Sequence, residues 1–308
     1  MLLTVRPLAL VCVALVLLAA AGCRDSGPSA GNGIVVVGTT TQVGDLLRQV
    51  GGRRVTVRQI LRPNSDPHEY EPRPSDVKSL ADAQLVVRSG GDVDDWLGSL
   101  VDNSGTGAPV LTLIDHVHRL RRNGDLDPHW WQDPRNAMLA VAAIRDRLVK
   151  VDPSRAGAYG RNAAHYVERL MRLDRGTATC IDRIPARGRK LVTTHDALGY
   201  YAARYGLEVI GAVLPSLSTQ AQPSAREVEA LVSQIERTGV KAIYPESSLN
   251  PKLEQAVARE SGASVGSALW ADSLGPEGSS GATYIASIAA NTRSIVHGLT
   301  GGTVDCSP

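Results

Sequence analysis

The sequence contains no phenylalanine, and aromatic residues make up only 4% of its 308 residues. Apolar residues nevertheless reach 43%, a share that is sufficient for well-packed cores. Leucine, valine, alanine and isoleucine must therefore fill most of the interior. A chain of this length suits two domains of ordinary size or one large domain.

A strong charge of either sign is also missing. The formal net charge is +2 at neutral pH, and the chain has no long block of lysine and arginine. Proteins whose main partner is a nucleic acid usually carry a concentrated positive charge. The composition therefore argues against nucleic acid as a partner.

Cysteine is scarce as well, with four residues and no Cys-x-x-Cys pair, which argues against a zinc site built from thiolates. Cys12 and Cys23 belong to an N-terminal segment, which leaves Cys180 and Cys306 in the body of the chain. Two remaining cysteines often pair in an exported protein. A Cys180–Cys306 disulfide and two free thiols both stay open at this point.

The first 22 residues have the pattern of an export signal. Arg6 precedes an apolar run over residues 8–21, which is shorter than the roughly 20 residues that a membrane-spanning helix needs. The run ends in small residues before Cys23, which resembles a bacterial lipoprotein cleavage site. We therefore predict an exported lipoprotein, anchored through a lipid on Cys23 and facing the periplasm or the outer cell surface. An ordinary signal peptide followed by a chance cysteine is the alternative.

Strand and helix patterns alternate along the rest of the chain. Short apolar runs, several of them rich in β-branched residues, indicate strands at 34–37, 55–57, 85–87, 110–113, 191–193, 208–210, 242–244 and 264–269. Helical patterns separate these strands. The alternation predicts an α/β protein with two lobes, each with a central, mainly parallel sheet flanked by helices.

One long helical pattern lies between the two sets of strands. It starts at Pro153, breaks at Pro185, and would span roughly 45 Å as a helix. We expect this single helix to join the two lobes. The predicted order is a signal peptide at 1–22, a flexible tether at 23–33, a lobe at 34–150, a linking helix at 151–185 and a second lobe at 186–308.

The tripeptide Asp-Pro-His occurs twice, ending at His68 and at His129. Proline restricts its own backbone and the residue before it, so each loop presents its histidine from a stiff backbone. His68 and His129 follow predicted strands of the first half, and His195 and Asp272 follow strands of the second. In open parallel sheets ligands bind beyond the carboxyl ends of the strands, so we expect these four side chains to meet there.

Three neutral imidazoles and one carboxylate form a site that suits zinc, with manganese as the alternative where oxygen donors count more. Nearby carboxylates could orient the imidazole rings. These carboxylates are Asp66, Asp127, Asp133, Asp196 and Glu246. Any one of the histidines alone would more often be an ordinary surface residue, and Asp272 alone fits a plain turn or helix start. The remaining histidines, namely His116, His118, His165 and His297, are predicted to be surface residues.

Longer motifs around these residues resemble the cluster A-I solute-binding proteins of zinc and manganese ABC transporters. The chain contains N-x-x-P-H-x-Y-E-P-x-P-S-D at 64–76, D-P-H-x-W-x-D-P at 127–134 and T-H-D-A-x-G-Y at 194–200. They resemble the first, second and third ligand motifs of that family. Glu246-Ser247 and D-S-L-G at 272–275 resemble its closing segment, and the similarity covers about residues 34–300.

The resemblance implies two α/β lobes that hold a metal ion in the cleft between them and shift only modestly on binding. It also implies delivery of the metal to a membrane permease driven by an ATPase, and we expect a monomer. Family members with Glu at the position of His195 often carry manganese. Many zinc members have a long His-rich loop before the second motif, whereas the loop at 115–126 is short here. Zinc is therefore the predicted cargo, and manganese remains open.

Two other interpretations compete with a transport protein. An exported zinc metalloenzyme would use Glu69 or Glu246 as its general base. Four protein ligands would fill the zinc tetrahedron, and the sequence has no H-E-x-x-H pattern, so we predict no enzyme activity. A surface adhesin or structural lipoprotein with an incidental metal is the other interpretation.

Overall fold

Two four-stranded sheets organise residues 33–308, the part of the chain that the computed structural model describes. Their strands are β1 (Ile34–Gly38), β2 (Val55–Gln59), β3 (Leu85–Arg88), β4 (Val110–Thr112), β7 (Lys190–Thr193), β8 (Glu208–Ala212), β9 (Ala242–Tyr244) and β10 (Ser264–Val265). The first sheet has the order β2-β1-β3-β4 and the second β10-β9-β7-β8, with every pair parallel. The predicted signal peptide and Cys23 lie outside the described residues.

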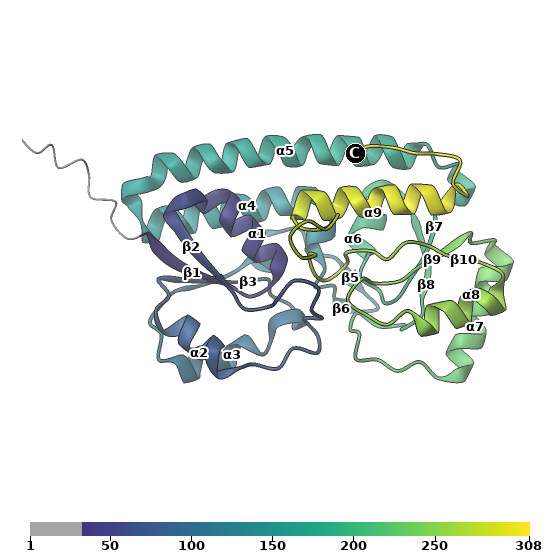
Figure 1. The fold of residues 1–308 in the computed structure, drawn as a ribbon, viewed down its shortest axis with the longest axis horizontal. Helices are drawn as coiled ribbons and strands as arrows, with labels where there is room; N and C mark the ends of the chain where they lie inside the picture. Colours follow the sequence, from purple (N-terminus) through teal and green to yellow (C-terminus); the bar gives the residue numbers. More distant parts are fainter. Residues whose placement is uncertain (1–32) are drawn as a thin grey trace, which may run out of the picture. The chain divides into compact units, whose positions relative to one another are not determined.

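Helices connect the strands and flank both sheets (Figure 1). They are α1 (Thr41–Gly51), α2 (Pro74–Ala81), α3 (Leu97–Ser104), α4 (Pro134–Val151), α5 (Ala156–Asp182), α6 (Gly199–Tyr205), α7 (Ala225–Thr238), α8 (Lys252–Ser261) and α9 (Tyr284–Leu299). Within residues 33–308 every helix is either too short or too polar to cross a membrane. The predicted fold class, with parallel sheets, flanking helices and one long helix, is confirmed.

Local sequence signals explain where several of these elements begin and end. Asp133 caps α4 by accepting a hydrogen bond from the backbone N–H of Arg135, and Pro134 occupies the first turn. A capping box opens α7, with Ser224 and Glu227 each accepting from the other's backbone N–H. Glycines in the left-handed conformation follow α6, α7 and α8.

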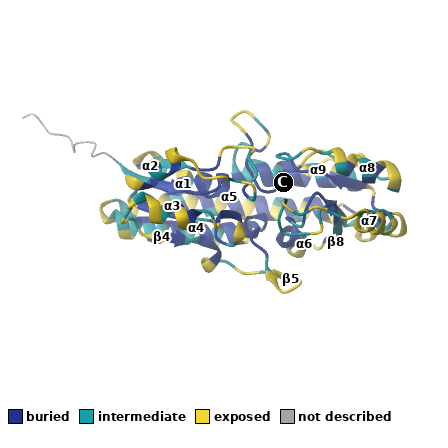
Figure 2. Ribbon diagram, turned by 90° about the horizontal axis from the view of Figure 1, so that it is seen from below, coloured by how far each residue is buried: buried dark blue, intermediate teal, exposed yellow. Residues whose placement is uncertain are grey.

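Two details of the sequence prediction were wrong. A two-stranded antiparallel hairpin, β5 (Arg121–Arg122) and β6 (Asp125–Leu126), occupies the loop for which no strand was predicted. Asn123 and Gly124 form its tight turn with positive φ angles of 52° and 96°. The Asn-Gly pair is a hairpin signal, but its flanking residues are charged and do not show the apolar alternation of strands. The hairpin is largely exposed (Figure 2). The last strand was predicted to reach residue 269, but β10 ends at Val265, and Leu269 forms only an isolated bridge.

Helix α5 runs alongside both halves of the described chain. Its 27 residues span about 40 Å. It packs against α1 and α4, which belong to the first half, and against α6 and α9 of the second. One hydrophobic cluster includes Val36 from the first sheet, Leu170 from α5 and Leu191 from the second sheet. The two sheets therefore share a continuous core.

The lack of phenylalanine has a visible consequence in this core. Tyrosines fill large buried positions, and their hydroxyl groups must find partners inside the protein. Tyr244 donates to the carbonyl of Ile295 at 2.9 Å, and Tyr284 donates to the carbonyl of Trp131 at 2.6 Å. The buried tyrosines thus form hydrogen bonds that connect one element of the fold to another.

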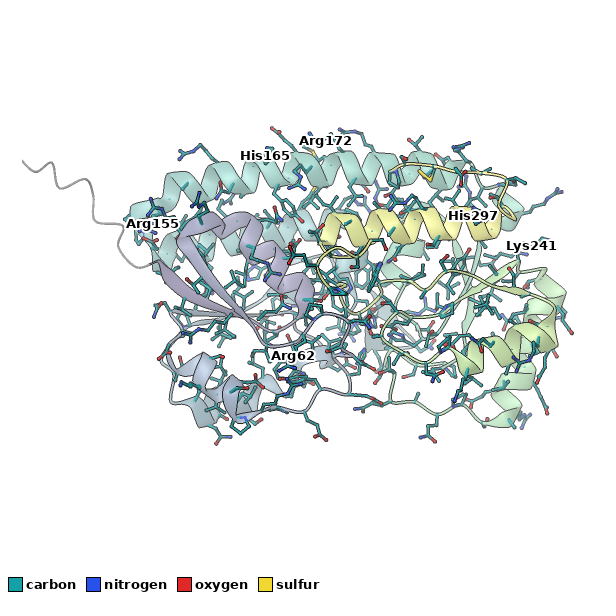
Figure 3. The ribbon with its side chains drawn as sticks, viewed as in Figure 1. Arg62, Arg155, His165, Arg172, Lys241 and His297 are labelled. Atoms are coloured by element: carbon teal, nitrogen blue, oxygen red, sulfur yellow. A yellow bond between two sulfur atoms is a disulfide. The ribbon has the colours of Figure 1, made fainter. Side chains whose placement is uncertain are left out.

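The structure also shows where the remaining cysteines and the predicted surface histidines lie. Cys180 on α5 and Cys306 in the C-terminal tail form a disulfide, with their Cα atoms 5.7 Å apart. His165 and His297 are exposed on α5 and α9, as Figure 3 shows, so their prediction as surface residues is confirmed. The other two predicted surface histidines, in the segment after β4, are exposed as well.

Candidate metal centre

The four predicted ligand side chains come together at the carboxyl ends of strands from both sheets. One potential ligand atom from each of His68, His129, His195 and Asp272 lies within 4.8 Å of the other three. All four side chains are almost completely buried. Residues separated by up to 204 positions in sequence thus build one compact group of three imidazoles and a carboxylate.

The distances within this group match those between ligands of one metal ion. Asp272 Oδ2 lies 3.0 Å from His195 Nε2 and 3.3 Å from His68 Nε2, and its Oδ1 lies 3.4 Å from His129 Nε2. The Nε2 atoms of His129 and His195 are 3.4 Å apart. Metal–ligand bonds of roughly 2.0 Å in a tetrahedron would separate neighbouring ligand atoms by about 3.3 Å.

Several of these atoms are buried without a hydrogen-bond partner among residues 33–308. They are both carboxylate oxygens of Asp272 and Nε2 of His68. A buried polar atom left without a partner costs about 1–3 kcal/mol. A cation coordinated by these atoms would remove that cost, so the donor set fits a divalent metal ion.

The two Asp-Pro-His loops repeat one local structure. In the first loop the carboxylate of Asp66 accepts a hydrogen bond from the backbone N–H of His68 at 2.9 Å. In the second loop the carboxylate of Asp127 accepts from the backbone N–H of His129 at the same distance. Each aspartate therefore closes a turn across the proline, and the sequence repeat becomes a repeated backbone geometry.

Two of the five predicted carboxylates contact imidazole rings. Asp127 Oδ1 forms a hydrogen bond with His129 Nδ1 at 2.8 Å, and Glu246 Oε2 lies 3.0 Å from His195 Nδ1. All four groups are buried. Holding Nδ1 in this way turns Nε2 of each ring toward the ligand cluster and makes the ring a stronger ligand.

The other three carboxylates do not contact the rings, so the predicted role was wrong for them. Asp66 uses its second oxygen to accept from the hydroxyl of Thr219 at 2.6 Å. Asp133 caps helix α4. Asp196 pairs with Arg122 of the hairpin at 3.2 Å. All three lie near a histidine in sequence, but their side chains point to other partners.

The charges in the cluster shift the pKa values of its members in opposite directions. Burial lowers the pKa of His195, but Asp272 and Glu246 outweigh burial and raise it well above its usual value. Burial also lowers the pKa of His68, and Asp272 again reverses the effect. Burial raises the pKa of Asp272, but His195 and His129 bring it well below its usual range. Protons would therefore compete with a metal ion for the imidazoles.

Residues of the first half hold the segment that carries Asp272. The indole N–H of Trp131 and the side-chain amide of Gln132 both donate to the carbonyl of Ala271 at 2.8 Å. Tyr284 in turn holds the backbone of Trp131. These contacts place the carboxylate, and no local pattern in the sequence indicates them because the partners lie about 140 residues apart.

The segment before α7 closes the site over His68. Thr219 contacts Asp66 as described, and the side-chain amide of Gln220 donates to the carbonyl of His68 at 2.6 Å. Neither residue was predicted from the sequence. Threonine and glutamine in a loop carry no signal of such a role, which depends on the two halves meeting.

Comparison with known proteins decides the family. The model of the family described as zinc-uptake complex component A, periplasmic, matches residues 36–298. The chain belongs to this family. The resemblance predicted from the ligand motifs is therefore confirmed.

Named relatives and solved structures agree with this assignment. The chain is 31% identical to the manganese-binding lipoprotein MntA of Halalkalibacterium halodurans over 292 residues, covering 93% of this chain and 96% of the relative. It is 27% identical to the metal ABC transporter substrate-binding lipoprotein SloC of Streptococcus mutans, covering 95% and 97%. The solved structure of the periplasmic zinc-binding protein TroA from Treponema pallidum superposes with a TM-score of 0.81 at 27% identity, covering 87% and 99%.

Proposed function

We propose that this protein captures a divalent metal ion, with zinc as the preferred cargo, and delivers it to the permease of an ABC importer. His68, His129 and His195 would bind through their Nε2 atoms and Asp272 through its carboxylate. The observation that carries this proposal is the buried cluster itself, whose ligand atoms lie within 4.8 Å of one another. Membership of the metal-uptake family supports the transport role.

The predicted division into lobes at 34–150 and 186–308, with a linking helix at 151–185, belongs to this proposal. Segments that follow the strands of each sheet supply two of the four ligands, so separating the lobes would break the site and release the metal. The core shared through α5 supports small movements of the lobes rather than wide opening. Release through a small movement suits a carrier that must bind tightly and still unload.

The site favours binding over catalysis. The two carboxylates considered as a general base do not suit that role, because Glu246 is buried with its Oε2 3.0 Å from His195 Nδ1 and Glu69 is exposed. Four protein ligands also leave no position for an attacking water on a tetrahedral zinc ion. We therefore propose a binding protein rather than a metalloenzyme.

Manganese is the second candidate cargo, and one observation favours it. Both oxygens of Asp272 lie within 3.4 Å of imidazole nitrogens and lack hydrogen-bond partners among the described residues. Two-oxygen coordination by this carboxylate would raise the coordination number and the share of oxygen ligands. Manganese prefers such a site more than zinc does.

A competitive titration of the metal-free protein with zinc and manganese tests the cargo. We expect the wild type to prefer zinc and His195→Glu to shift the preference toward manganese, because an oxygen donor replaces an imidazole. His165→Ala is the matched control, since that histidine is exposed on α5 and should leave both affinities unchanged. Equal or tighter binding of manganese by the wild type would overturn the zinc assignment, and binding of neither ion would overturn the proposed function.

Export and anchoring complete the proposal. A lipid on Cys23 would hold a monomer at the membrane beside its permease and ATPase, on the periplasmic or outer face. Mass spectrometry of the protein from membranes should detect the lipid, and Cys23→Ser should release the protein into the soluble fraction. Unmodified Cys23 in the membrane-bound protein would contradict the anchor.

A further inference from the structure

A buried carboxylate lies behind the metal cluster and has no role in the site described so far. Glu254 sits in the first turn of α8 and is 2% exposed. Its Oε1 accepts a hydrogen bond from the hydroxyl of Thr194 at 2.6 Å. Its Oε2 has no hydrogen-bond partner among residues 33–308. A buried acid of this kind is costly and calls for an explanation.

The fold supplies part of the compensation for this charge. Glu254 lies near the N-terminus of a ten-residue helix, where free backbone N–H groups and the helix dipole favour a negative group. An exposed glutamate in the first turn would gain the same interaction without the cost of burial. The helix end therefore explains why the carboxylate is tolerated, and its contact with Thr194 explains why it is buried.

A short chain of contacts leads from this carboxylate to a proposed metal ligand. Thr194 donates its single hydroxyl proton to Glu254 and accepts a hydrogen bond from the backbone N–H of Glu246 at 2.9 Å. The carboxylate of Glu246 lies 3.0 Å from Nδ1 of His195. Because a hydroxyl has only one proton, its bond to Glu254 leaves a lone pair directed at the Glu246 N–H.

We propose that Glu254 and Thr194 are positioning residues for His195. Together they hold the backbone of Glu246, and Glu246 in turn holds the imidazole with Nε2 aimed at the cluster. The three segments that meet here are the end of β7, the end of β9 and the start of α8. This inference rests on the proposed metal-binding function and deepens it, since it makes the placement of His195 depend on Glu254, whose carboxylate hydrogen-bonds to Thr194 rather than to a proposed ligand.

Two pairs of variants in the full chain separate positioning from simple packing. Thr194→Val keeps the side-chain shape but removes the hydroxyl, and Thr194→Ser restores the hydroxyl. Glu254→Met keeps approximate length but removes the acceptor, and Glu254→Gln restores an acceptor oxygen. Thr177→Val is the control, because Thr177 is a fully buried threonine on α5 whose hydroxyl has no hydrogen-bond partner among the described residues.

The measurements are zinc affinity by competition with a chromophoric chelator and the visible spectrum of the Co²⁺-loaded protein. We expect Thr194→Val and Glu254→Met each to lower zinc affinity about tenfold, the low end of the range for groups that contact a ligand directly, because these two residues act through Glu246. Thr194→Ser and Glu254→Gln should recover wild-type affinity to within about threefold. The double variant should lose little more than either single variant, because both remove the same chain of contacts. The Co²⁺ bands should shift in the two disruptive variants only.

A different set of results would overturn the positioning role. Wild-type zinc affinity and an unchanged Co²⁺ spectrum in Thr194→Val and Glu254→Met, with only a lower melting temperature, would reduce both residues to packing and overturn the inference. If Glu254→Met does not fold, the Thr194→Val and Thr194→Ser pair decides alone. If the wild type itself binds neither zinc nor cobalt, the proposed function fails first and takes this inference with it.

Discussion

Replacing Asp127 by asparagine tests the reasoning about the metal centre most directly. Asp127 and His129 are both fully buried, and Asp127 Oδ1 lies 2.8 Å from the ring Nδ1 of His129. Asparagine keeps the size and one acceptor oxygen, so it can still close the turn across Pro128. It removes the negative charge that makes the imidazole a stronger ligand. The substitution thus changes the electrostatics of one ligand with little change of shape.

The size of the effect follows from this contact. Loss of a carboxylate that orients a metal-binding histidine typically lowers metal affinity by 10- to 100-fold. That range corresponds to about 1.4–2.8 kcal/mol of binding free energy. We expect the Asp127→Asn variant to fall within it when zinc affinity is measured by chelator competition at pH 7.5.

Asp196 provides the matched control. It also adjoins a proposed ligand in sequence, but its side chain pairs with Arg122, and both side chains are partly accessible to solvent. Such a pair contributes about 0–1 kcal/mol, so Asp196→Asn should change zinc affinity by less than about fivefold. An unchanged affinity in Asp127→Asn, or an equal loss in both variants, would refute the assignment of Asp127 to the His129 ring.

Three further predictions concern the pKa of His195, the segment before α7 that contains Gln220, and the Cys180–Cys306 disulfide. Because the pKa of His195 is raised in the metal-free fold, its protonation stabilises that fold below the usual histidine pKa, and this contribution is lost as the pH rises through the raised value. Zinc should therefore raise the melting temperature more at pH 8 than at pH 6, and a larger shift at pH 6 would contradict this sign. Gln220→Ala removes a hydrogen bond of about 0.5–1.5 kcal/mol to the backbone of His68, so stopped-flow chelation should show zinc release about 2- to 12-fold faster; an unchanged rate would show that the segment does not gate the site. Cys306→Ser should lower the free energy of unfolding in guanidinium by about 2–5 kcal/mol with no change in zinc affinity. Weaker zinc binding without a loss of stability would show that the disulfide supports the metal site rather than the fold.

Much of this protein is determined by the sequence alone, because the relevant signals are local. The β-branched run at β1 and the capping residues of α4 and α7 act within a few positions of the chain, so strands and helices could be located from their patterns. The Asp-Pro-His repeats likewise close their own turns. Residues at the carboxyl ends of parallel strands share one edge, which is why four distant side chains could be predicted to meet.

The tertiary structure alone decided which groups support those ligands. Asp127 lies two positions from His129 in sequence and Asp196 lies directly after His195, yet only Asp127 contacts a ring, because Asp196 pairs with Arg122 of the unpredicted hairpin. Gln220 and Glu254 carry no local signal at all. Their roles depend on which side chain each meets when segments 60 to 150 residues apart pack together. A side chain's direction is set by that packing, and sequence neighbours do not reveal it.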